Sequence, residues 1–225
     1  MIGDYYSSKL SGRRLRLCYE IAPPRVQRYL EAEIAFVLER IRPSSLVLEL
    51  GCGYGRVIDR LAASARGAVG IDTSRDSLLM AREYVGPRSS CRFAQMNAAA
   101  LGFRDGCFDL VACVQNGISA FNIDKRTLIQ EAVRVTRPGG RVLFSSYSER
   151  FWPHRLAWFR IQAEYGLIGP IDDEATGDGV IVCEDGFQAT TVGPDEFTSL
   201  LAAYPLPAQI SEVDGSSLFC EIAVV

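Results

Sequence analysis

The stretch Glu49-Leu50-Gly51-Cys52-Gly53-Tyr54-Gly55-Arg56 decides the fold. It continues an apolar run and leads into a helical pattern over 56–65, so alternate glycines lie between a buried strand and a helix. Glycine has no Cβ, and a ligand can therefore touch the backbone of such a loop directly. About twenty positions further on, a second apolar run ends at Asp72, whose carboxylate can accept hydrogen bonds from ribose hydroxyls. The loop and Asp72 together predict a site for an adenosine-containing ligand.

Short apolar runs alternate with helical patterns on both sides of this loop. We expect strands at Leu46–Leu50, Ala68–Asp72, Arg92–Gln95, Phe108–Val114 and Gly140–Tyr147, with helices near 56–65, 75–85 and 125–136 between them. Strands joined by crossover helices form a parallel sheet with helices on both faces. Two further runs, 209–213 and 218–225, are too close together for a crossover and predict an antiparallel C-terminal hairpin. The sequence therefore predicts an α/β fold with a doubly wound, mostly parallel sheet of seven strands.

The length of 225 residues and the hydrophobic share of 48% suit one domain with a large core. Pro23-Pro24 precedes a helical pattern that ends at 42, so residues 1–42 are expected to form an N-terminal helical cap. The regular alternation stops after Tyr147 and resumes with a helix at Pro194. Between them lie an aromatic stretch, an acidic loop and a short hairpin pattern. We therefore predict a single domain, 1–225, with an inserted substrate lid at 147–193.

The overall composition limits the classes of partner. The net charge of −3 does not favour nucleic-acid binding, for which a basic face is expected. The seven cysteines include no C-x-x-C pair, so the sequence predicts no metal site and indicates a reducing compartment. No apolar run approaches the ~20 residues that span a bilayer. These features predict a cytoplasmic protein without a membrane anchor, and they leave open a monomer or a homodimer.

Arg56 decides between two ligand classes. The dinucleotide-binding loop needs a glycine at this sixth position for close helix packing, so nicotinamide and flavin dinucleotides are disfavoured. The stretch VLELGCGYGRV instead resembles the E/D-x-G-x-G-x-G motif of class I methyltransferases, with Glu49 as its acidic head. GIDTSRDSLLMARE (70–83), QMNAAALGF (95–103) and EAVRVTRPGGRVLFSS (131–146) resemble later motifs of that family, in the same order. The resemblance implies a Rossmann-like fold, the cofactor S-adenosyl-L-methionine and the product S-adenosyl-L-homocysteine.

The resemblance also implies which residues bind the cofactor. Asn97 stands where the family commonly has aspartate, and its side-chain oxygen can still accept a hydrogen bond from the adenine amino group. Gln115 and Asn116, after the fourth strand, are expected to face the methionyl group. The alternative for that pair is a capped strand end. The complete cofactor-binding set is Glu49, Gly51, Gly53, Asp72, Thr73, Asn97, Ala98 and Gln115.

The family implies methyl transfer to a small-molecule N, O or S nucleophile by in-line displacement, which needs positioning more than covalent help. His154 is the candidate general base, because it is the single histidine and lies near Trp152 and Trp158 in the expected lid. A surface or core histidine beside aromatic packing is the favoured alternative. Two other functions stay open. One is a tRNA or rRNA methyltransferase using the arginines near 13–16, and the other is a non-catalytic cofactor-binding protein.

Overall fold

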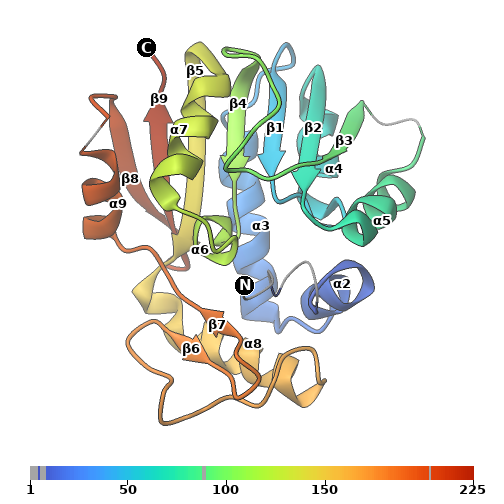
Figure 1. Cartoon of the computed structure of the whole chain (residues 1–225), viewed down its shortest axis with the longest axis vertical. Coiled ribbons are helices and arrows are strands. Elements are labelled where there is room, and N and C mark those ends of the chain that lie inside the picture. The colour runs from blue at the N-terminus through green and yellow to red at the C-terminus, as the bar shows by residue number, and fades with distance from the viewer. Residues whose placement is uncertain (1–4, 6–8, 88–89, 203) are drawn as a thin grey trace.

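The computed structural model describes Tyr5 and residues 9–87, 90–202 and 204–225. A seven-stranded sheet with the order β3-β2-β1-β4-β5-β9-β8 forms its centre (Figure 1). The first five strands pair in parallel, whereas β9 is antiparallel to both β5 and β8. The strands are β1 (Leu46–Leu50), β2 (Gly67–Asp72), β3 (Cys91–Gln95), β4 (Phe108–Cys113), β5 (Thr136–Tyr147), β8 (Ala208–Val213) and β9 (Ser217–Ala223). The predicted fold class is confirmed, although β5 begins earlier than the predicted Gly140.

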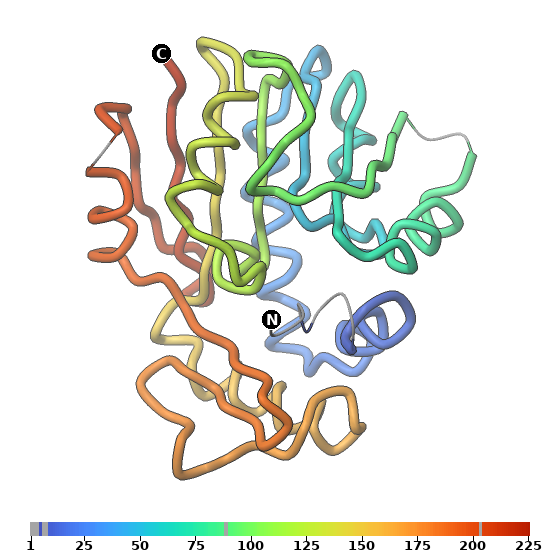
Figure 2. The backbone as a smooth tube through the Cα atoms, viewed as in Figure 1, coloured from blue at the N-terminus to red at the C-terminus, as the bar shows by residue number. Residues whose placement is uncertain are grey.

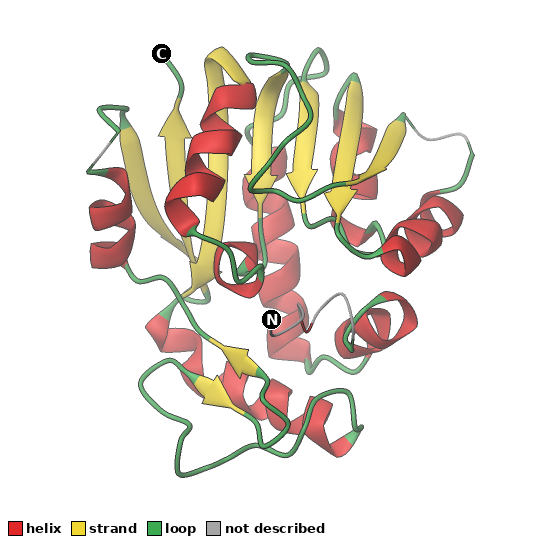
Figure 3. Ribbon diagram, viewed as in Figure 1, coloured by secondary structure: helices red, strands yellow, loops and turns green. Residues whose placement is uncertain are grey.

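Helices cover both faces of this sheet (Figure 3). One face packs against α3 (Pro24–Leu38), α4 (Arg56–Ser64) and α5 (Arg75–Val85), and the other packs against α7 (Lys125–Val135) and α9 (Pro194–Leu201). Alternate residues of β1 point to opposite faces of the sheet. Val47 packs in the core beneath α3, α4 and α5, and Leu48 packs in the core beneath α7 and α9. None of the described helices is both long and apolar enough to cross a membrane.

A third layer lies beyond the carboxyl ends of the parallel strands, at the bottom of the tube view (Figure 2). It contains α2 (Gly12–Glu20), α8 (Trp152–Glu164) and a separate antiparallel pair, β6 (Ile181–Val182) and β7 (Gln188–Ala189). The short hairpin that the sequence pattern predicts in the insert is therefore present. A buried cluster in this third layer joins α2, α8 and the β6–β7 pair to the first half of α3 and the end of β5. Residues 1–4 and 6–8 of the predicted cap lie outside the described residues.

Candidate active site

The glycine loop adopts backbone angles that favour glycine. Gly51, Gly53 and Gly55 have φ values of 74°, 51° and 93°. A Cβ on Gly51 would lie 2.5 Å from the ring of Phe121, so the close approach also requires glycine. The carboxylate of Asp72 accepts hydrogen bonds from Gly53 N–H (2.9 Å) and Ser74 N–H (2.8 Å). Asp72 thus ties the loop after β1 to the end of β2.

A cavity of about 360 Å³ begins at this loop. The predicted cofactor residues in its wall are Gly51, Gly53, Asp72, Thr73, Asn97, Ala98 and Gln115. Their arrangement follows from the fold, because the carboxyl ends of neighbouring parallel strands open at one edge of the sheet. Asn97 is exposed, and its side-chain oxygen accepts a hydrogen bond from Ala99 N–H at 2.8 Å. The structure therefore gathers all of the predicted cofactor-binding residues except Glu49 at one site.

Glu49 differs from the rest of the predicted set, because it is not among the described residues that line the cavity. Its side chain is buried, and burial raises its pKa to about 8, although the charge of Arg56 acts in the opposite direction. Its Oε2 makes no hydrogen bond to any described residue. The geometry places Glu49 under the glycine loop rather than in the cavity wall.

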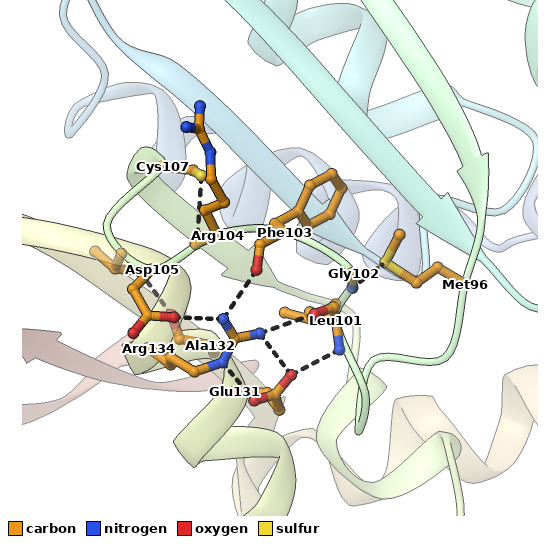
Figure 4. A network of polar contacts seen from close by, with 11 residues as sticks. Met96, Leu101, Gly102, Phe103, Arg104, Asp105, Cys107, Glu131, Ala132 and Arg134 are labelled. Carbon is orange, nitrogen blue, oxygen red and sulfur yellow. Dashed lines mark hydrogen bonds and ion pairs between the residues drawn. The ribbon is translucent and has the colours of Figure 1, made fainter.

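The loop that carries Asn97 and Ala98 is fixed by Arg134 of α7 (Figure 4). The guanidinium donates to the carbonyls of Leu101 and Phe103 at 2.8 and 2.9 Å. Glu131 pairs with the same guanidinium and accepts a hydrogen bond from Leu101 N–H at 2.6 Å. Both partners are partly exposed, so we assign this network a positioning role rather than a large share of the stability.

Gln115 and Asn116 form a tight elbow after β4, with φ values of 55° and 61°. Positive φ is uncommon for non-glycine residues and must be held in place by surrounding contacts. Gln115 N–H donates to Oε2 of the buried Glu33 at 2.7 Å, and the Ser217 hydroxyl donates to its Oε1 at 2.9 Å. The side-chain Nδ2 of Asn116 donates to the carbonyl of Thr190, and its Oδ1 accepts a hydrogen bond from the Ser146 hydroxyl. These contacts hold the elbow so that Gln115 lies in the cavity wall. The side-chain Nε2 of Gln115 has no hydrogen-bond partner among the described residues.

The other end of the cavity is aromatic. Its lining rings come from α2, α3, the end of β5 and α8, and they are Tyr19, Tyr29, Tyr147, Trp158 and Phe159. The indole N–H of Trp158 donates to the carbonyl of Cys18 at 2.9 Å and so joins α8 to α2.

The sequence pattern predicts aromatic side chains at this end from the insert only. Tyr29 lies within the helical pattern that ends at 42, and periodicity predicts that such a side chain is buried without showing what covers it. The position of Tyr147 at the carboxyl end of a parallel strand was the available signal. Phe121 follows α6 (Gly117–Ala120), a short helix that the sequence analysis did not predict.

His154 lies elsewhere. It is exposed on α8, its ring is 5.8 Å from that of Phe151, and it is not among the described residues that line the cavity. A general base must reach the reacting group within hydrogen-bond distance or through one water. The geometry gives no support to that role for His154, and it agrees with the alternative of a surface histidine beside aromatic packing.

Comparison with known proteins assigns the family. Residues 47–140 match the family model described as a methyltransferase domain. The chain is 31% identical, over 62% of its length, to 2-methyl-6-phytyl-1,4-hydroquinone methyltransferase of Synechocystis, of which it covers 46%. Residues 47–140 of this chain carry a methyltransferase domain of the class I S-adenosylmethionine-dependent family. The chain spans about half the length of the first curated relatives it matches.

Solved structures agree on the fold. A protein from Pyrococcus horikoshii superposes with a TM-score of 0.69 at 22% identity and full coverage of both chains. The N-methyltransferase NodS from Bradyrhizobium japonicum was crystallised with S-adenosyl-L-homocysteine. It gives a TM-score of 0.57 at 18% identity, and the match covers 93% of this chain and 95% of NodS. The cofactor of this family is S-adenosylmethionine, and the wall of the cavity fits it. An adenosine with an amino-acid tail requires polar contacts along its length. The wall offers the glycine backbone, the Asp72 carboxylate and the side-chain Nε2 of Gln115, which has no partner among the described residues.

Proposed function

We propose that this protein transfers a methyl group from S-adenosylmethionine to a small-molecule N, O or S nucleophile. The observation that carries the proposal is one continuous cavity, which runs from the glycine loop and Asp72 to the rings of α3 and α8. When bound, S-adenosylmethionine supplies a methyl group on positively charged sulfur, and the acceptor's lone pair displaces that sulfur in line. The two ends of the cavity suit the two partners of such a reaction.

The residues of the chain would act mainly by positioning. Asp72 and the amides of the glycine loop would hold the ribose and the methionyl group, while Asn97 and Ala98 would contact the adenine. Gln115, fixed at the elbow by Glu33, lies between the two ends and would orient the methionyl group. The buried rings of the outer end would keep water away from the reacting atoms, which favours displacement of the sulfur by the acceptor.

We further propose that 147–193 is the lid over the acceptor and that 1–42 caps the same end. Two contacts between them support this arrangement. Arg14 of α2 donates to the carbonyls of Gly166 and Leu167 at 2.7 and 2.9 Å, and Trp158 donates to Cys18 O. The arginines of α2 are exposed, as on the solvated face of a helix. Acidic Asp173 and Glu174 of the lid are also exposed and stand outside the described lining.

Calorimetry and a transfer assay together test the proposal. We expect S-adenosylhomocysteine to bind with one site per chain and nicotinamide dinucleotide not to bind. Methyl transfer from labelled cofactor is then measured against amines, thiols, phenols and carboxylates, with bulk tRNA as a competing substrate. Tight binding of the nicotinamide dinucleotide without binding of S-adenosylhomocysteine contradicts the proposal. Preferential methylation of tRNA contradicts the small-molecule part of it.

A further inference from the structure

The helix α8 turns one face towards the interior of the protein, and this face is partly polar. Its buried residues are Arg155, Trp158, Phe159 and Gln162, which are related by three- and four-residue steps and therefore lie along one side of the helix. Trp158, Phe159 and Gln162 line the outer end of the cavity. Gln162 thus places a side-chain amide among the rings of this wall.

The side-chain amide of Gln162 has unused hydrogen-bonding capacity. Its Oε1 and Nε2 make no hydrogen bond to any described residue, whereas the backbone carbonyl of Gln162 accepts a hydrogen bond from Leu167 N–H at 2.9 Å. Neither amide atom belongs to the described polar atoms that are fully enclosed without a partner. The residue keeps 3% of its surface accessible, and this remainder therefore includes the amide. Because Gln162 lines the cavity, its amide can contact a ligand held there.

Three other polar side chains of this wall are already occupied. The hydroxyl of Tyr29 is fully enclosed and interacts with that of Tyr147. The indole N–H of Trp158 donates to the carbonyl of Cys18 at 2.9 Å. Of these four side chains, Gln162 is therefore the one that offers a ligand free hydrogen-bonding capacity.

The outer end holds no ionised side chain among the described residues that line it. Asp72 is the one charged residue of the described lining, and it lies at the cofactor end. Arg155 is buried behind the rings, and its Nη1 and Nη2 donate to the carbonyls of Gly179 and Ala189, each at 2.8 Å. An ionised acceptor would therefore lose its hydration without contacting a group of opposite charge, whereas an uncharged polar group needs one hydrogen-bonding partner.

We infer that Gln162 determines acceptor specificity, because its amide hydrogen-bonds an uncharged polar group of the acceptor. An amide both donates and accepts hydrogen bonds, so the matching group is one that does the same, a hydroxyl or a carboxamide. The surrounding rings favour a flat apolar body behind that group. This inference rests on the proposed function and narrows it to uncharged acceptors of this kind.

Three probes of one shape test the chemical class of the acceptor. 4-Ethylbenzamide, 4-ethylacetophenone and 4-ethylbenzoate are titrated at pH 7.5 into the full chain saturated with S-adenosylhomocysteine, and ligand-observed NMR gives the dissociation constants. We expect the carboxamide to bind about threefold to tenfold more tightly than the ketone and at least about tenfold more tightly than the carboxylate. Equal or tighter binding of the ketone or the carboxylate overturns the inference, and so does binding of none of the three. Failure of S-adenosylhomocysteine to bind at the start instead removes the proposed function itself.

The role of Gln162 is tested by Gln162→Met, which keeps a long unbranched side chain but removes the amide. Gln130→Met, at an exposed position of α7 outside the described lining, is the matched control. We expect the preference for the carboxamide over the ketone to fall to within about twofold in Gln162→Met alone, while both variants retain the affinity for S-adenosylhomocysteine. The melting temperature without ligand should stay equal or rise, because the change removes an amide that has no described partner. An unchanged preference overturns the inference, and a lower melting temperature beside it would assign Gln162 a structural role.

Discussion

At the cofactor end of the cavity the lining residues follow β1, β2, β3 and β4 directly, whereas at the outer end they come from α2, α3, β5 and α8. The first arrangement is local, since each loop takes its position from its own strand and the strands are neighbours in the sheet. The second joins segments from opposite parts of the chain. The repeated βα units therefore position the cofactor end through local structure, whereas the outer end depends on packing between segments far apart in the sequence.

Glu33 stands at the boundary between the two ends and gives the largest expected effect. Its side chain is fully buried, and burial raises its pKa from 4.5 to about 7 despite the hydrogen bonds from Gln115 N–H and Ser217. The contribution of Glu33 to the free energy of unfolding is therefore complete below pH 4.5. It is lost as the pH rises towards 7, because the Glu33 carboxyl ionises in the unfolded chain and stays protonated in the folded chain. The loss amounts to about 1.4 kcal/mol per pH unit, or about 3 kcal/mol in all.

Glu33→Gln removes this titration. Between pH 4.5 and 7, we expect the unfolding free energy of the wild type to fall by about 3 kcal/mol relative to that of the variant. Urea unfolding at a series of pH values measures it, and other groups cancel in the difference. Glu39→Gln, at an exposed carboxylate beyond the end of α3, is the control for the loss of a carboxylate at the surface. A pH-independent difference for Glu33→Gln would mean that Glu33 ionises normally in the fold.

Asp72 tests the cofactor end. Asp72→Ala removes a carboxylate that holds Gly53 N–H and is expected to accept the ribose hydroxyls. A charge-assisted hydrogen bond contributes about 1.5–3 kcal/mol, so the affinity for S-adenosylhomocysteine should fall about tenfold to a hundredfold. Calorimetry measures this, with Asp76→Ala on the exposed first turn of α5 as control. Unchanged affinity in a folded variant would move the ribose contact to another residue.

Trp158 tests the outer end. Trp158→Phe keeps a ring in the wall but removes the N–H that donates to Cys18 O, at a cost of about 1 kcal/mol or about 2–4 °C in melting temperature. We expect the acceptor KM to rise while the affinity for S-adenosylhomocysteine stays the same. Trp152→Phe, on the same helix but not among the described lining residues, is the control. An equal loss of cofactor affinity would show that the two ends do not act independently.

The same contrast explains what could be predicted from the sequence. The glycine loop, Asp72 and the order of β1 to β5 follow from local signals, which are alternate glycines, an acidic strand end and regular spacing. Glu49 was assigned to the cofactor site by motif alone, and its buried carboxylate shows that a motif position does not fix where a side chain points. The pairing of Tyr29 with Tyr147, and the contact from Trp158 to Cys18, depend on tertiary packing between distant segments. No local pattern contains that information.

His154 gives the smallest expected effect and tests the sequence-based hypothesis of a general base. The residue is exposed on α8 and is not one of the described cavity-lining residues, so its ring has no contact with an acceptor held in the cavity. His154→Ala should leave kcat/KM within about twofold of the wild type, as substitutions at the surface usually do. Steady-state methyl transfer by the wild type and the variant provides the measurement. A large fall in kcat, with unchanged melting temperature and cofactor affinity, would place His154 at the reaction centre and would require α8 to turn towards the cavity during the reaction.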